Sequence, residues 1–252
     1  MKKTLLYLFV FVAIQFAASL GIQALFRLFD PSPEMKLLQM LLSMSLFAVM
    51  TIVVFLYAKW SLVSPHYLRT RPWAVLCWSV LAALGAIIPS VWLQEQLPVL
   101  PNVMEESFSM ILKGRWGYVV VGLLAPVAEE IVFRGAILRT LLQKFGPWKA
   151  IWISAVLFAL VHGNPAQMPH ALLVGLLLGW MYWRTGSILP GIAYHWVNNS
   201  VAYLLYNILP NPDATLVELA GGNSTKVLLW LLCSLCILVP SLLQLHQRME
   251  RK

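Results

Sequence analysis

The sequence predicts an all-α fold, a polytopic membrane helix bundle of about eight transmembrane helices. Three observations predict it. Of the 252 residues, 60% are hydrophobic and only 11% are charged, which is outside the usual range of soluble globular domains. Apolar runs long enough to cross a bilayer recur along the whole chain. Lys and Arg gather in alternate connections between these runs, and this asymmetry orients membrane helices.

Each apolar run is expected to form one helix, and the fifth and sixth runs are short. The longest connection, about 95–116, is acidic with two prolines, and we expect an external loop or surface helix there. The whole chain, 1–252, is expected to form a single integral membrane domain. The eight runs lie near residues 4–26, 37–58, 73–94, 117–139, 148–164, 168–184, 187–208 and 227–246.

The formal net charge of +8 comes from basic residues scattered between apolar runs rather than striped along one face, so nucleic acid is not an expected partner. One set of connections is rich in Lys and Arg, and the positive-inside rule predicts that both chain termini lie with it in the cytoplasm. The expected location is therefore multi-pass, in a bacterial plasma membrane. The basic side holds Lys2, Lys3, Lys59, Arg69, Arg71, Arg139, Lys144, Lys149, Arg184, Arg248, Arg251 and Lys252. The other side holds Arg27, Lys36, Lys113, Arg115 and Lys226 with Asp30, Glu34, Glu95, Glu105, Glu106, Asp213 and Glu218.

Three ionisable residues interrupt the fourth apolar run: Glu129, Glu130 and Arg134. Together they would cost about 8 to 10 kcal/mol at the middle of an isolated span, so the folded bundle must compensate, and such residues mark a functional site by default. Glu130 and Arg134 are spaced i, i+4 and should pair. Glu129 is turned by about 100° from Glu130, which leaves it as the candidate for chemistry.

Two local features favour a cavity beside these residues. Pro126 cannot donate the helical hydrogen bond to the carbonyl of Gly122, which fits either a kinked helix lining a wet cavity or a plain kink. Ala171, Gly175 and Gly179 form a stripe of small residues that lets neighbouring helices pack closely.

Further polar residues lie on the fifth and seventh runs. His162 ends the fifth run, and His195 and Asn199 share one face of the seventh. Together with Glu129 they could accept a proton, polarise a carbonyl and hydrogen-bond an oxyanion. His170 is expected to lie at the membrane interface, and Asn198 to face elsewhere and pack between helices.

The motifs together resemble the CPBP family of intramembrane peptidases, which contains the type II CAAX prenyl endopeptidases and the bacteriocin-processing and immunity (Abi) proteins. Its pattern is EExxxR, FxxxH and HxxxN on successive spans. The resemblance covers about 117–207, the catalytic core, and leaves 1–94 and 227–246 as accessory helices. The matching residues here are Glu129, Glu130, Arg134, Phe158, His162, His195 and Asn199.

The resemblance implies roles for these residues. Glu129 would activate the attacking water with help from His162, while His195 and Asn199 would stabilise the oxyanion. Glu130 and Arg134 would support the site or position substrate. This glutamate mechanism needs no cofactor, and the alternative is a Zn²⁺ site formed by Glu129, His162 and His195.

The predicted function is therefore that of an intramembrane endopeptidase, a CAAX-type protease acting on membrane-associated or lipid-anchored proteins or peptides. A non-enzymatic immunity or scaffold protein could use the same polar cluster to bind a partner. An ion-coupled transporter would also explain buried carboxylates, but the sequence has no duplicated halves of the kind many transporters show. The substrate and the oligomeric state remain open.

Overall fold

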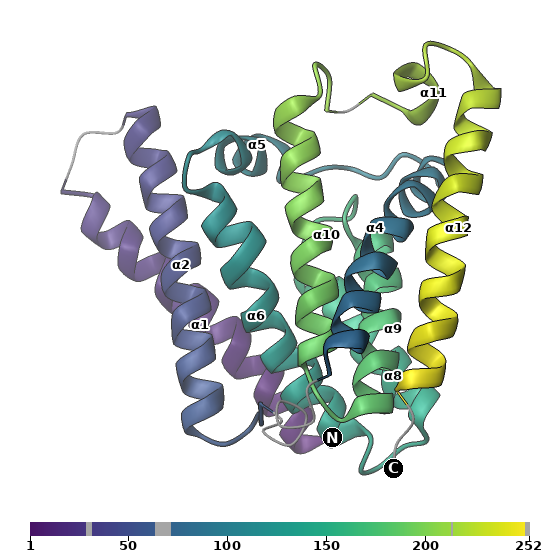
Figure 1. Ribbon diagram of the computed structural model, residues 1–252. Coiled ribbons are helices and arrows are strands. Elements are labelled where there is room, and N and C mark those ends of the chain that lie inside the picture. The colour runs from purple at the N-terminus through teal and green to yellow at the C-terminus, as the bar shows by residue number, and fades with distance from the viewer. Residues whose placement is uncertain (29–31, 64–71, 213, 250–252) are drawn as a thin grey trace.

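The computed structural model describes residues 1–28, 32–63, 72–212 and 214–249, and these form helices and connecting segments without a β-strand (Figure 1). Every apolar run within them is helical, close to the predicted bounds. The long helices are α1 (Lys2–Phe26), α2 (Pro33–Tyr57), α4 (Trp73–Glu95), α8 (Pro147–Val161), α9 (Met168–Thr185), α10 (Leu189–Ile208) and α12 (Ser224–Arg248). Residues 119–141 form one continuous helix of four segments: η1 (Val119–Leu124), α6 (Ala125–Glu130), η2 (Ile131–Leu138) and α7 (Arg139–Leu141).

Four helices, α1, α2, α4 and α12, are long and apolar enough to cross a membrane, and α8 is a shorter apolar helix. The all-helical class and the membrane-spanning character are therefore confirmed, whereas a count of eight crossings stays a prediction. With 15 and 18 residues, α8 and α9 extend only about 22 and 27 Å at 1.5 Å per residue. They are shorter than the roughly 30 Å hydrocarbon layer, and the connection after α4 covers part of the turn that joins them.

Figure 1 shows which elements lie at each of the two ends of the bundle. The terminal end contains the start of α1, the end of α12 and the α9–α10 turn. The far end contains α5 (Glu105–Lys113), α11 (Leu216–Leu219) and the connection from α4. Of the charged residues used for the topology prediction, Arg69, Arg71, Arg251, Lys252, Asp30 and Asp213 lie outside the described residues.

The core lies at the terminal end of the bundle. All eight residues of η2 are buried and pack against α1, α2 and α8. Aromatic side chains fill the contact: Phe133 meets Phe11 at a ring-centroid distance of 5.4 Å and Phe158 at 5.1 Å. A second unit is formed by α4 and α12, which pack along each other and carry the second hydrophobic cluster with α9 and α10.

The connection after α4 folds over the short α8–α9 hairpin. Asn164, in the turn of that hairpin, donates to Asn102 Oδ1 at 2.8 Å and accepts from the Val103 amide at 3.2 Å. The chain then forms α5, which starts with Glu105 and Glu106 and packs on α2 and α10 through Ile111 and Leu112. The surface helix expected between residues 95 and 116 is thus present, and it covers the hollow left by the short helices.

Candidate active site

The helix that carries the two glutamates has two wide, π-helical stretches, η1 and η2, on either side of α6. In η1 the Ala125 amide donates to the carbonyl of Val120, five residues back. The next bond in this register would run from residue 126 to Val121, but Pro126 has no N–H. Asn199 donates its Nδ2 to the Val121 carbonyl instead, at 3.0 Å. Pi-helical turns occur often at functional sites.

This register corrects one sequence-based expectation. Pro126 was expected to free the carbonyl of Gly122, as in a regular α-helix. In the wider η1 turn the proline instead interrupts the bond to Val121, and Asn199 on α10 supplies the missing donor. Pro126 and Asn199 therefore act together to join α10 to the glutamate helix.

Glu130 and Arg134 form the expected i, i+4 pair, completely buried behind the cavity. Arg134 Nη1 lies 2.6 Å from Glu130 Oε1, and the two side chains are 1% and 0% exposed. Arg134 also donates Nη2 to the Gly175 carbonyl at 3.3 Å and lies 4.5 Å above the centre of the Phe158 ring. The small residue at position 175 thus has a second effect, because it brings a backbone acceptor within reach of the guanidinium.

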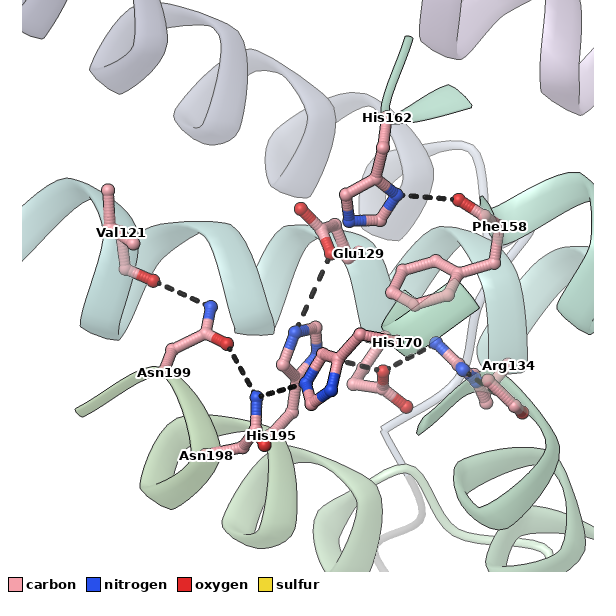
Figure 2. Close-up of polar contacts among 11 residues, drawn as sticks. Val121, Glu129, Arg134, Phe158, His162, His170, His195, Asn198 and Asn199 are labelled. Atoms are coloured by element: carbon pink, nitrogen blue, oxygen red, sulfur yellow. Dashed lines mark hydrogen bonds and ion pairs between the residues drawn. The ribbon is translucent and has the colours of Figure 1, made fainter. Parts of the chain in front are cut away.

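His195 lies between the two glutamates (Figure 2). Its Nδ1 is 3.3 Å from Glu130 Oε1, and its Nε2 is 3.7 Å from Glu129 Oε2. An ionised carboxylate only accepts hydrogen bonds, so the contact with Glu130 requires the proton on Nδ1. The Nε2 atom is then left on the Glu129 side, where it can exchange a proton with that carboxylate.

Glu129 does not pair with Arg134, and it lies instead beside His195 of a neighbouring helix. At 21% exposed it is the more accessible of the two glutamates, and it lines the cavity.

His162 and His195 approach each other across Phe158. The His162 ring centroid lies 4.9 Å from the Phe158 ring and the His195 centroid 5.9 Å, both edge to face. His162 Nδ1 is 2.8 Å from the Phe158 carbonyl, an acceptor, so Nδ1 carries the proton and Nε2 remains available on the other side of the ring. His162 and Glu129, both labelled in Figure 2, line the same cavity. The short α8 places His162 deep enough for this arrangement.

A cavity of about 890 Å³ brings the candidate residues together. Glu129, His162, His195 and Asn199 all line it, while Glu130 and Arg134 lie behind its wall. Apolar side chains of α1, α2 and α5 form the opposite wall. The structure thus supports the grouping predicted from the motifs, and the chemical roles remain to be tested.

Two further polar residues line the same cavity, and one of them, Asn198, packs between helices as expected. Asn198 does not face away: its Nδ2 lies 3.3 Å from Asn199 Oδ1 and 3.4 Å from His170 Nε2. His170 is a cavity residue in the first turn of α9. The i, i+3 spacing of Asn198 from His195 could have indicated the shared face.

No group of three or more His, Cys, Asp or Glu within the described part of the chain is arranged to hold a metal ion. In this arrangement, then, the side chains proposed for a Zn²⁺ site do not form a closed ligand set. The cofactor prediction itself stays a prediction.

The fold and the site together define a class of protein: an all-helical membrane protein with a buried Glu–Arg pair, and with two histidines and a half-buried glutamate at a cavity. The family model "Type II CAAX prenyl endopeptidase Rce1-like" matches residues 112–201, the part of the chain that contains all these residues. The resemblance to the CPBP family predicted from the motifs is therefore confirmed for this part of the chain.

A curated relative from Bacillus subtilis (strain 168), named "Putative membrane peptidase YdiL", is 30% identical over 112 residues. The alignment covers 41% of this chain and 45% of the relative, so the chain spans less than half the length of the protein it matches. No solved structure matches the chain.

Proposed function

We propose that this protein is an intramembrane endopeptidase that hydrolyses a peptide bond of a membrane-associated or lipid-anchored substrate. The observation that carries the proposal is the position of Glu129, which lines the cavity with its Oε2 3.7 Å from His195 Nε2. A carboxylate beside a histidine, in a cavity with a largely apolar wall, has the composition of a general acid–base site. The match to a peptidase family supports the same conclusion.

In the proposed reaction, Glu129 takes a proton from a water molecule as the water oxygen attacks the substrate carbonyl, with His162 Nε2 holding that water. The negative charge then develops on the carbonyl oxygen, where Asn199 can donate its second Nδ2 hydrogen and His195, once Nε2 is protonated as well as Nδ1, can donate its Nε2–H. When the C–N bond breaks, the proton held by Glu129 passes to the leaving amine. Water is thereby divided between the new carboxylate and the new amine.

Glu130 and Arg134 position the site rather than touch the substrate. Glu130 fixes the His195 ring through Nδ1, and Arg134 holds Glu130 through a bond within the same helix. Both contacts are made by the same carboxylate oxygen, Oε1, and together they restrict the rotation of the Glu130 side chain.

The membrane topology and the cellular location predicted from the sequence also form part of this proposal. All eight helical units cross the membrane, both termini lie in the cytoplasm, and the membrane is a bacterial plasma membrane. The uneven distribution of Lys and Arg supports this orientation.

The proposal is tested by comparing membrane proteomes from cells that contain the wild-type protein or the Glu129→Gln variant. Glu34→Gln on the exposed first turn of α2 makes the same chemical change outside the cavity and is the matched control. An uncleaved precursor should accumulate only with Glu129→Gln. If processing is unaffected while the cellular phenotype persists, the non-enzymatic partner-binding alternative is selected. Loss of cleavage with a chelator, restored by Zn²⁺, would select the metal mechanism.

A further inference from the structure

The cavity is closed toward the terminal end of the bundle. From Glu129 the helix continues into η2, where every residue from Ile131 to Leu138 is buried. Glu130 and Arg134 lie within this packed region at 0% and 1% exposure. A substrate therefore has no path to Glu129 from the side of the termini without unpacking the core.

The cavity does reach the molecular surface elsewhere. Gln94, Gly163 and Ala202 are single exposed lining residues, and two stretches of the chain each contribute several. One is the connection and first turn of α5, where Asn102, Met104 and Ser107 are exposed and also line the cavity. The other is the second half of α1, where Gln15 and Phe16 are also exposed and line the cavity.

Charge distinguishes the two ends of the bundle. In the described chain, the basic residues at the terminal end have no acidic residue near them in sequence. The far end has both basic and acidic residues. The positive-inside rule assigns the terminal end to the cytoplasm, so the open end of the cavity faces outward. The terminal end holds Lys2, Lys3, Lys59, Arg139, Lys144, Lys149, Arg184 and Arg248, and the far end holds Arg27, Lys36, Lys113, Arg115 and Lys226 with Glu34, Glu95, Glu105, Glu106 and Glu218.

We infer that the substrate is a peptide segment held at the outer leaflet, which enters sideways between the second half of α1 and the 102–107 segment. Its apolar side chains would lie against Phe11, Met44 and Phe47 of the cavity wall, while its backbone reaches Glu129. The inference rests on the proposed function for what happens to the peptide after entry, but not for the route.

Two phenylalanines of α1 make a matched pair for testing the route. Phe16 lines the cavity and is 64% exposed, whereas Phe9 is 70% exposed but does not line it. They are seven residues apart and so share one helical face. Each is replaced in turn by benzoylphenylalanine in the Glu129→Gln protein, in vesicles of known orientation, and a biotinylated, acylated apolar peptide is added to the outer face. After illumination, position 16 should cross-link several-fold more probe than position 9. Equal cross-linking from both positions would overturn lateral entry.

The outward orientation is tested separately with thiol labelling. The three native cysteines are free, and they are first replaced by serine. Single Ser107→Cys and Gln143→Cys variants then report on the far end and the terminal end, since both positions are exposed. A membrane-impermeant maleimide added to intact cells should label only the Ser107→Cys variant. Labelling of that variant only in inverted vesicles would overturn the inference.

These measurements do not depend on catalysis. If position 16 cross-links the peptide as expected while the wild-type protein never cleaves any peptide, the proposed function fails and the entry route stands. If cleavage depends on Glu129 but the cross-links are equal, the route fails and the function stands.

Discussion

His195 Nδ1 lies 3.3 Å from Glu130 Oε1, the same oxygen that Arg134 Nη1 contacts at 2.6 Å. One buried carboxylate oxygen thus connects a cation of its own helix to a histidine of α10. This relationship makes Glu130 a positioning residue for His195, and it leads to the first prediction.

Glu130→Gln should reduce both stability and activity. The amide cannot balance the buried Arg134 charge, and removing one partner of a buried ion pair typically costs about 3 to 5 kcal/mol. Thermal unfolding in detergent measures the loss of stability. The double variant Glu130→Gln with Arg134→Met should recover much of the stability without the activity, because His195 still lacks its anionic partner.

If that double variant were as active as the wild type, Glu130 would have no positioning role. Glu34→Gln, on the exposed first turn of α2, controls for a general effect of removing a carboxylate.

Gly191→Ala should lower activity more than it lowers protein abundance. A Cβ built on Gly191 would lie 2.6 Å from Glu130 Oε2, so the carboxylate must shift away from His195. The expected result is a fall in kcat without a matching rise in KM, measured on reconstituted protein.

Gly21→Ala is the control for this substitution, since Gly21 is also helical and a Cβ there meets nothing within 4 Å. A Gly191→Ala protein with unchanged kcat would show that the close approach to Glu130 has no catalytic consequence.

Asn199→Ala should destabilise the protein because the Val121 carbonyl loses its donor. Leaving a buried carbonyl without a hydrogen bond costs about 1 to 3 kcal/mol. Adding Pro126→Ala supplies a backbone N–H at the position that can donate to this carbonyl, so the double variant should regain stability. Unfolding temperatures of the two single variants and the double variant give the coupling.

Activity measurements distinguish the structural role of Asn199, its bond to the Val121 carbonyl, from its proposed role in stabilising the oxyanion. The rescued double variant should remain slow if the amide also stabilises the oxyanion, whereas full recovery of activity would leave Asn199 with only a structural role.

Much of the fold could be predicted from the sequence because apolar runs of membrane length have few alternative structures. The helix bounds at α1, α2 and α12 follow these runs closely. The Glu130–Arg134 pair was also predictable, since i, i+4 neighbours on one helix meet without any knowledge of the tertiary structure.

The contacts between helices could not be predicted in the same way. The register that places Val121 opposite Asn199 depends on wide turns, which spacing rules for a regular α-helix do not describe. The position of His195 between Glu129 and Glu130 depends on how α10 packs against α6, and the cavity position of His170 depends on the short α8–α9 hairpin.

The most direct test of the central claim is cleavage of an identified precursor by purified protein in liposomes, followed by mass spectrometry of the products. The wild-type protein should convert the precursor into two fragments whose masses add up to the precursor plus one water. The Glu129→Gln variant, inserted to the same level, should leave the precursor intact. The same two fragments at the same rate from Glu129→Gln would contradict the assignment of Glu129 as the residue that activates water.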